Sequence, residues 1–328
     1  MRRSIRLLLG FPRDVSRVDS IIVSCDASTA GSDSLTLLVI DTDPGVDDAL
    51  ALLLAWGSPG VRVEAITTVA GNVPLGQCTV NLFRLLALRR PEPWPLVAAG
   101  AEAPLARPLK TAEGYHGADG LGALGDWPEV EARPGPSGAV ELLVEKARHH
   151  GARLTLVALG PLTNIALACE ADPAAMRRIG RVVAMGGAVD VRGNVTPTAE
   201  FNVHVDPEAA ARVLDAGLSL DLVPLDATRR ATVTRAELER ALGARPGPVA
   251  TRVLAFTRHA FAREGGRLSL HDPLAIGAAI DETLMEWEPA RLTIGSDGET
   301  RRTPGPPNCR VAVGVDTARF VRLLLERL

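Results

Sequence analysis

Residues 35–54 read LTLLVIDTDPGVDDALALLL, and this stretch decides the fold class. Its first six residues form an almost continuous apolar run, which is typical of a buried parallel strand. The acidic turn DTDPG comes next, and the segment from Val46 onward has the apolar spacing of a helix. The stretch therefore predicts a strand, a loop and a helix in that order, with the loop at the carboxyl end of the strand.

The same alternation of strand and helix continues along the rest of the chain. Further apolar runs that predict strands lie at 61–70, 95–100, 153–159, 181–187 and 218–226. Helical patterns follow them, and the last 13 residues, 316–328, form an amphipathic helical pattern. This alternation predicts an α/β fold, with an open, mostly parallel sheet covered by helices on both faces. We expect one large domain over residues 35–328.

Local signals mark several of the predicted element boundaries. Asp206 precedes Pro207, a pair typical of a helix N-terminus, and Gly217 follows the end of that helix. Thr234 and Glu237 have the spacing of a capping box. Near the C-terminus, RLTIGS (291–296) and CRVAVGV (309–315) are expected to pair as an antiparallel hairpin.

The composition excludes some classes of function. The chain has 328 residues, with 36 Lys or Arg against 39 Asp or Glu, a formal net charge of −3. A nucleic-acid binder normally carries a clear basic excess, so we expect no nucleic-acid polymer as partner. With six Phe, four Trp and one Tyr, the core is expected to be aliphatic.

The N-terminus and the cysteines bear on localisation. Residues 1–34 have a basic start, but Arg6, Pro12 and Arg13 interrupt the apolar stretch, so we interpret them as a poorly ordered extension. No apolar run reaches the ~18 residues that a membrane span needs. The four cysteines are widely scattered without a Cys-x-x-Cys pair, which favours a reducing compartment. We therefore expect a cytoplasmic protein.

The acidic turn is the most informative part of the sequence. Asp41, Asp43, Asp47 and Asp48 place four carboxylates within eight residues, with no Lys or Arg among them. Helix capping explains one or two of these acids, but like charges ~4–6 Å apart need a cation or raised pKa values. A hard divalent ion with oxygen ligands satisfies them, and Ca²⁺ tolerates irregular carboxylate sets better than Mg²⁺ does. The turn therefore predicts a metal site.

This turn resembles the signature of the nucleoside hydrolase family, the inosine–uridine preferring nucleoside N-ribohydrolases. Three later motifs are similar to those of the family and occur in the expected order, GPLTN (160–164), MGG (185–187) followed by GN (193–194) and AEFN (199–202), and SLHDPL (269–274). The resemblance runs from about residue 36 to the C-terminus. Residues 1–34 have no counterpart, and the connection 296–308 is shorter and richer in Pro.

The resemblance implies a function and a metal site. The family hydrolyses the N-glycosidic bond of ribonucleosides to free base and ribose, in purine or pyrimidine salvage or catabolism. By resemblance, Ca²⁺ is held by Asp43, Asp48, Asp272 and the backbone carbonyl of Leu159. Asp43 would be the base that activates a metal-bound water, and Asp47 would hold a ribose hydroxyl.

The resemblance also implies a set of substrate contacts. These residues are Asn72, Met185, Asn194, Glu200, Phe201 and Asn202. Amides and a carboxylate suit a sugar that becomes positively charged in the transition state. A turn-forming role remains an alternative for Asn72, and a loop role for Asn194. Phe201 is expected to pack beneath the sugar.

Two histidines are candidates for the leaving-group side of the bond. His271 precedes a proposed metal ligand, and an imidazole with a pKa near neutrality can protonate the departing base. His116, in a glycine-rich loop suited to closing over substrate, resembles a base-contacting histidine of the family. A structural role is the alternative for His271. His204 is expected in the core or behind the site.

Two other functions are consistent with parts of the sequence. A non-catalytic nucleoside or ribose-binding protein would use the same pocket, but it would be expected to lose an acid from the 41–48 loop or Asp272. A Mg²⁺-dependent aspartyl phosphotransferase would need a Lys near its phosphate, and the only lysines are Lys110 and Lys146. The favoured hypothesis is a calcium-dependent ribonucleoside hydrolase that forms a homodimer or homotetramer.

Overall fold

The apolar run before the acidic turn forms β1 (Thr36–Thr42), a strand inside a large sheet. The computed structural model describes residues 35–328, so the extension predicted for residues 1–34 lies outside the described residues. Seven more strands complete the sheet, namely β2 (Val61–Thr68), β3 (Leu96–Ala99), β4 (Leu154–Ala158), β5 (Arg181–Met185), β6 (Leu220–Val223), β9 (Met285–Ala290) and β12 (Cys309–Val315). All six strands predicted from the apolar runs are confirmed, with small differences in length.

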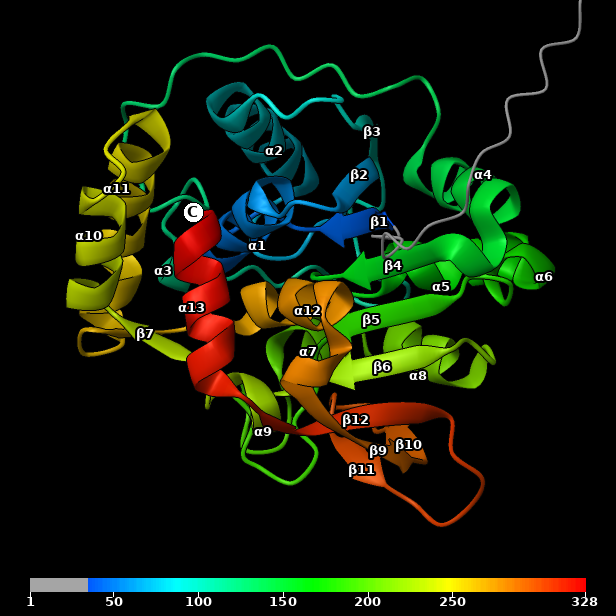
Figure 1. Ribbon diagram of the computed structural model, residues 1–328. Helices are drawn as coiled ribbons and strands as arrows, with labels where there is room; N and C mark the ends of the chain where they lie inside the picture. The colour runs from blue at the N-terminus through cyan, green and yellow to red at the C-terminus, as the bar shows by residue number, and fades with distance from the viewer. Residues whose placement is uncertain (1–34) are drawn as a thin grey trace, which may run out of the picture. The chain divides into compact units, whose positions relative to one another are not determined.

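From top to bottom in Figure 1, the strand order is β3-β2-β1-β4-β5-β6-β12-β9. Within the described residues, every neighbouring pair in this sheet is parallel except β12 and β9. The chain moves outward from β1 to β3 and then returns to place β4 on the other side of β1. In open α/β sheets a ligand crevice forms at the carboxyl ends of strands where the order reverses, here between β1 and β4.

Helices cover both faces of the sheet, which confirms the predicted α/β class. One layer contains α4 (Ala139–His150), α5 (Thr163–Ala171), α6 (Pro173–Met176) and α8 (Pro207–Asp215). The other contains α1 (Val46–Gly57), α2 (Leu75–Arg89) and α12 (His271–Ile280). Along β1, Leu38 and Ile40 pack in one core and Val39 in the other, because successive side chains of a strand point to opposite faces.

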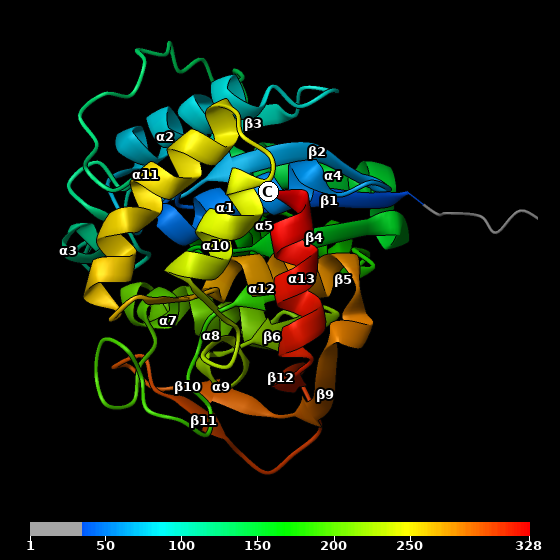
Figure 2. The ribbon, with the colours of Figure 1, turned by 60° about the vertical axis from the view of Figure 1, so that its left-hand side comes forward.

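A further group of helices lies outside α1 and α12, as Figure 2 shows. These helices are α10 (Arg235–Gly243), α11 (Pro248–Arg263) and α13 (Thr317–Arg327). The shorter elements are α3 (Glu113–His116), α7 (Phe201–Val205), α9 (Leu225–Thr228), β7 (Thr232–Thr234), β8 (Arg267–Ser269), β10 (Leu292–Ile294), β11 (Thr300–Arg302) and the 3₁₀ turns Gly151–Arg153 and Glu282–Leu284. None of the helices within residues 35–328 combines the length and apolar character that crossing a bilayer requires.

The helix boundaries predicted from capping residues are confirmed. Asp206 accepts a hydrogen bond from the Ala209 amide at 3.0 Å, and Pro207 begins α8. Thr234 and Glu237 form the predicted capping box of α10. These contacts join residues three positions apart, so sequence spacing alone can identify them.

The predicted hairpin between 291–296 and 309–315 is wrong. β12 instead pairs with β9 in the main sheet, whereas β10 pairs with β11 in a separate two-stranded ribbon. β9 has the sequence MEWEPA, whose charges and Pro289 conceal a strand. A strand at the sheet edge tolerates proline because one of its sides needs no ladder hydrogen bonds.

Candidate active site

The polar residues predicted for the site meet in one cavity at the carboxyl edge of the sheet. Its volume of about 590 Å³ is within the usual range for a small-molecule pocket. It is lined by the predicted residues Asp47, Asn72, His116, Leu159, Met185, Asn194, Glu200, Phe201, Asn202, His271 and Asp272. Asp43 and Asp48 are buried directly behind this lining, where both contact Asn72.

Asp48 organises the turn between β1 and α1. One of its carboxylate oxygens accepts from Thr42 Oγ1 at 2.5 Å, and the other accepts from the Gly45 amide at 2.9 Å. The second bond belongs to a capping arrangement at the start of α1. Asp48 therefore performs the capping role that the sequence suggested for some of these acids, while it remains part of the acidic group.

Asn72 holds two acids of the turn together. Its backbone amide donates to Asp43 Oδ2 at 2.7 Å, and its side-chain Nδ2 donates to the Asp43 carbonyl at 3.1 Å and to Asp48 Oδ2 at 3.0 Å. The preceding Gly71 has to lack a side chain, because a Cβ there would lie 2.1 Å from Asp43 Oδ2. Asn72 thus contacts both acids rather than only shaping a turn.

Asp41 belongs to a separate buried network beneath the cavity. Its Oδ1 accepts from Thr67 Oγ1 at 2.5 Å and from Asn164 Nδ2 at 2.8 Å. Burial nevertheless raises the pKa of Asp41 to about 7, although these two donors act in the opposite direction. Asn164 belongs to the GPLTN motif after β4, and its Nδ2 also donates to the Thr68 carbonyl at 3.0 Å, so this motif contacts both β1 and β2.

Four acids meet at the floor of the cavity. One carboxylate oxygen each from Asp47, Asp48 and Asp272 lies within 4.8 Å of the others. Burial, followed by the charge of Asp48, raises the pKa of Asp47 to about 8 and raises that of Asp43 well above its usual value. Burial and then the charges of Asp47 and Asp48 do the same to the pKa of Asp272. Burial is the main cause of these shifts, and the negative charges of the neighbouring acids add to it.

The donor set of this acidic group fits a hard cation. Asp43 Oδ1 and Asp47 Oδ1 are buried and accept no hydrogen bond from the described residues. Among residues 35–328, no Lys or Arg nitrogen lies within 4.0 Å of the four carboxylates, and the nearest basic contact is His116 Nδ1 at 3.9 Å from Asp47. Buried charges without partners are costly, and oxygen donors of this kind bind Ca²⁺ or Mg²⁺.

Asn202 joins the ends of two strands. Its Nδ2 donates to the Leu159 carbonyl after β4 at 2.6 Å and to the Met185 carbonyl at the end of β5 at 3.2 Å. A carbonyl oxygen has two lone pairs, so this contact leaves Leu159 able to bind a cation as well. Met185 is buried, and its sulfur also contacts Asn202 at 3.5 Å.

The remaining predicted sugar contacts differ in burial. Glu200 is buried and caps α7, accepting from the amides of Gly187, Asn202 and Val203 at 2.9–3.1 Å. Its oxygens are therefore already engaged by the backbone. Asn194 is exposed on the loop before it, and Phe201 is half-buried at the start of α7.

His271 begins α12 and lies in the cavity wall. Its Nδ1 is 2.8 Å from Thr228 Oγ1, a contact that sequence analysis did not predict. Burial, and secondarily the charge of Arg229, lowers the pKa of His271 to about 4. The expectation of a near-neutral pKa is thus wrong, because the cavity excludes the water that would solvate an imidazolium.

His116 contributes to the turn as well as to the cavity. Its Nδ1 accepts from the Val46 amide at the start of α1 at 3.1 Å, and burial lowers its pKa to about 4. The neighbouring Tyr115 packs edge-on against it, with ring centroids 4.8 Å apart. Tyr115 also donates to Glu264, which accepts from Ser269 Oγ at 2.8 Å.

Several cavity residues were not predicted from the sequence. They are Lys110, Thr111, Ala112, Tyr115, Val195, His204, Arg229, Glu264 and Ser269. His204 was expected behind the site, but it lines the cavity and its Nε2 is 3.2 Å from Lys110 Nζ. Tyr115 is the only tyrosine in the chain and precedes a candidate histidine, a signal that could have identified it.

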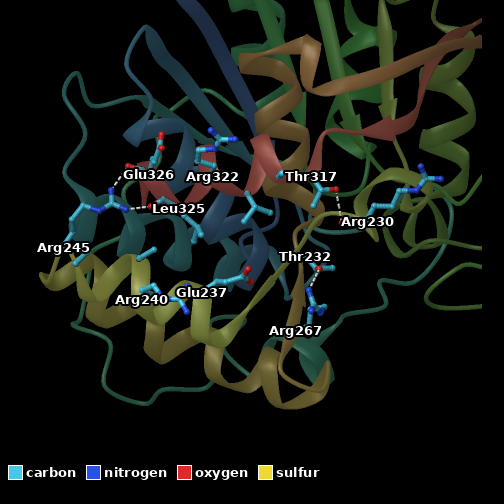
Figure 3. Close-up of a pocket in the computed structure, with 14 residues that line it drawn as sticks. Arg230, Thr232, Glu237, Arg240, Arg245, Arg267, Thr317, Arg322, Leu325 and Glu326 are labelled. Atoms are coloured by element: carbon cyan, nitrogen blue, oxygen red, sulfur yellow. Dashed lines mark hydrogen bonds between the residues drawn. The ribbon is translucent and has the colours of Figure 1, made fainter.

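A larger concavity lies elsewhere, between α10 and α13 (Figure 3). Its volume is about 1060 Å³, and Arg230, Arg240, Arg267 and Arg322 lie along it. Arg245 at its end donates to the carbonyls of the last turn of α13. This groove holds none of the acids described above and lies away from the strand ends, so the smaller cavity is the candidate active site.

Comparison with known proteins is consistent across sequence and structure. The family described as "Inosine-uridine preferring nucleoside hydrolase" matches residues 38–322. A pyrimidine-specific ribonucleoside hydrolase RihA from Enterobacter sp. (strain 638) is 38% identical over 309 residues, covering 89% of this chain and 97% of that protein. The inosine-uridine preferring nucleoside hydrolase of Leishmania major is 36% identical over 305 residues, covering 89% and 96%. A solved plant nucleoside hydrolase superposes with a TM-score of 0.83 at 35% identity, covering 89% of this chain and 98% of that one.

Proposed function

The chain belongs to the inosine-uridine preferring nucleoside hydrolase family, and on that premise we propose a calcium-dependent ribonucleoside hydrolase. Family membership makes it a hydrolase of N-glycosyl compounds that acts on ribonucleosides. The observation that carries the finer proposal is that Asp47, Asp272 and His271 line one cavity, with the buried Asp43 and Asp48 directly behind its lining. A non-catalytic binding protein and an aspartyl phosphotransferase are thereby set aside.

We propose that Asp43, Asp48, Asp272 and the Leu159 carbonyl hold Ca²⁺. The support is a buried set of hard oxygen donors whose charges the described residues leave uncompensated. When bound, the cation supplies a Lewis acid that lowers the pKa of water and orients ribose hydroxyls. Asp47 belongs to the same group and lines the cavity, which supports its role as an acceptor for a ribose hydroxyl.

Asp43 is the proposed general base. Its Oδ2 is held by the Asn72 amide at 2.7 Å, which leaves Oδ1 without a donor from the described residues. Burial raises the pKa of Asp43 well above its usual value, and a raised proton affinity suits a group that accepts a proton from an attacking water. Because Asn72 holds Oδ2, the carboxylate has a fixed orientation, and Oδ1 is the oxygen left to accept the proton.

The ribose is proposed to lie against the MGG and AEFN segments. Asn194 and Asn202 line the cavity and offer their side-chain amides to the hydroxyls of the ribose. Glu200 places a buried carboxylate near a sugar that becomes cationic in the transition state. Met185 and Phe201 supply apolar surface to the sugar.

His271 is proposed to assist the departing base. With a pKa lowered to about 4, the imidazole is neutral at physiological pH. When its Nδ1 accepts from the Thr228 hydroxyl, the ring proton resides on Nε2 and is free to form a hydrogen bond with the base. His116 is proposed to contact the base from the other wall. Both purine and pyrimidine ribonucleosides of the inosine–uridine type are candidate substrates.

The decisive experiment measures reducing sugar released from a panel of ribonucleosides and deoxyribonucleosides by the purified protein. We expect release from ribonucleosides, weak release from deoxyribonucleosides, and loss of activity with a chelator that Ca²⁺ reverses. Asp43→Asn should slow release by about 100-fold or more, whereas Asp126→Asn, a matched change at an exposed loop residue that pairs with Arg252, should leave it unchanged. Release that is indifferent to both the chelator and Asp43→Asn would contradict the proposal.

We also propose a cellular location and an oligomeric state for the protein. Cys78, Cys169 and Cys309 are buried free thiols, which supports the proposal of a reducing, cytoplasmic location. The proposal of a homodimer or homotetramer rests on the family resemblance. Light scattering of the purified protein measures the oligomeric state directly.

A further inference from the structure

The short segment after β6 contacts both sides of the proposed active site. α9 begins at Leu225, whose amide donates to the Gly187 carbonyl at 2.9 Å. Within the same segment, Thr228 lies 2.8 Å from His271 Nδ1 on the leaving-group side. The segment therefore connects the loop after β5 with the start of α12.

Two side chains of this segment hold the loop that carries Asn194. The buried Asp226 carboxylate accepts from the amides of Val189 and Asp190 at 3.0 and 2.8 Å. The Arg229 guanidinium donates to the carbonyls of Arg192 and Gly193 at 2.5 and 3.0 Å. The loop is thus bonded at four backbone groups between residues 189 and 193, the last of them one residue before Asn194.

We propose that Arg229 is a positioning residue, which fixes the loop 189–193 so that Asn194 faces the ribose. This inference rests on the proposed function. The planar guanidinium suits two neighbouring carbonyl acceptors, which a single ammonium cannot bind with the same geometry. Arg229 itself lines the cavity, whereas the Asn194 side chain is exposed and makes no hydrogen bond with the described residues. Its backbone amide bonds to Ala199 at 3.2 Å, but its side chain depends on the loop conformation.

The adjacent Arg230 provides a matched control. Arg230 has the same charge as Arg229 and is its neighbour in the chain, but its side chain lies in the separate groove of Figure 3. Its contact with α13 is made by the backbone carbonyl, which accepts from Thr317 Oγ1 at 3.2 Å. Arg230→Met therefore removes one positive charge without altering the contacts of the loop.

The test compares steady-state kinetics of Arg229→Met, Arg229→Lys, Arg230→Met and Asn194→Ala on a ribonucleoside that the wild-type protein hydrolyses. Arg229→Met should reduce kcat/KM by about 10- to 100-fold, mainly through KM, since a displacement of about 1 Å can have such an effect. Arg229→Lys should recover part of the loss, and Arg230→Met should match the wild type. If Arg229 acts through Asn194, the double variant Arg229→Met/Asn194→Ala should be no worse than Asn194→Ala alone.

A second readout does not depend on activity. Hydrogen exchange of the amides in 189–194 should be faster in Arg229→Met than in the wild type and unchanged in Arg230→Met. Two results would overturn the inference. One is a loss of kcat/KM in Arg229→Met/Asn194→Ala that equals the sum of the two single losses in free energy. The other is equal hydrogen exchange of 189–194 in Arg229→Met and Arg230→Met. If Arg229→Met fails to fold, Arg229→Lys answers the same questions. A wild-type protein that hydrolyses no nucleoside would contradict the proposed function, while the exchange measurement would still test the role of Arg229.

Discussion

Buried aspartates at two places in the same sheet have opposite surroundings. Asp221 on β6 is bound by Arg181 Nε at 2.5 Å and by Arg310 Nε and Nη2 at 2.6 and 2.7 Å. Asp43 and Asp48 at the end of β1 are just as buried, yet no described Lys or Arg lies within 4.0 Å of them. Asp221 has its counter-charges within the chain, whereas the acidic group has none among the described residues, which is what the proposed calcium site would need.

The comparison separates structural from functional charge. A buried carboxylate bound by arginines is satisfied by folding and contributes to the native state. A buried carboxylate without such partners raises the free energy of the folded protein until a ligand binds. The same residue type therefore predicts stability in one place and a binding site in the other.

The largest expected effect is on activity. Asp43→Asn removes the proposed base and a proposed calcium ligand, so kcat should fall by about 10²–10⁴-fold or more. Asp221→Asn is the same chemical change in an equally buried position, and its kcat should be close to that of the wild type. Assays of released ribose on both variants measure this contrast, and equal losses would remove the distinction.

The next effect is on the free energy of unfolding, where Asp221→Asn should cause the larger loss and Asp43→Asn little or none. Asp221→Asn leaves the guanidinium groups of Arg181 and Arg310 without their carboxylate, which should lower the free energy of unfolding by about 3 kcal/mol. Asp43→Asn removes a repelling charge, so the calcium-free variant should be at least as stable as the wild type. Urea unfolding in the presence of a chelator gives both values. A larger loss for Asp43→Asn than for Asp221→Asn would contradict the comparison.

Calcium itself should stabilise the protein through the acidic group alone. A ligand that binds only the folded state stabilises it by about 2.7 kcal/mol at 100 times its Kd. Thermal unfolding with and without Ca²⁺ should therefore show a shift in the wild type and in Asp221→Asn, and no shift in Asp272→Asn. A shift that survives in Asp272→Asn would place the cation elsewhere.

A further prediction concerns the dependence of stability on pH. Burial raises the pKa of Asp47 to about 8 and that of Asp41 to about 7, so the folded protein keeps protons that the unfolded chain releases above pH ~4. Because the folded state then binds more protons, the stability of the calcium-free protein should fall as the pH rises from about 4 to about 8. Unfolding midpoints with a chelator test this, and Asp47→Asn should reduce the slope. A stability that rises over this range would show that the carboxylates are ionised without a partner.

Much of the fold was predictable because its signals are local. The six predicted strands are nearly continuous apolar runs, and such runs are typical of strands buried on both faces. The caps at Asp206 and Thr234 depend on bonds to residues three positions away. β9 was missed because Pro289 and the charges around it are compatible with a strand only at the sheet edge, and a local pattern does not show where an edge lies.

The candidate site was predictable in its membership but not in its contacts. The acidic turn, the amides and His271 occur in motifs that the sequence displays directly. The contact between Thr228 and His271 joins residues 43 positions apart, and that between Asn164 and Asp41 joins residues 123 positions apart. Arg229 and Glu264 carry no local signal, since each becomes a cavity residue only when distant segments meet.

The sequence by itself placed four carboxylates within eight residues at the end of a buried strand, a pattern that predicts a cation site. The tertiary structure decided that Asp272 joins the acids of the turn while Asp41 lies in a separate network, that Asp221 is paired with arginines, and that burial lowers the pKa of His271. The physical reason is that spacing along the chain controls periodic burial and short-range hydrogen bonds. Desolvation and pKa values instead depend on which distant segments exclude water from a side chain and supply its partners.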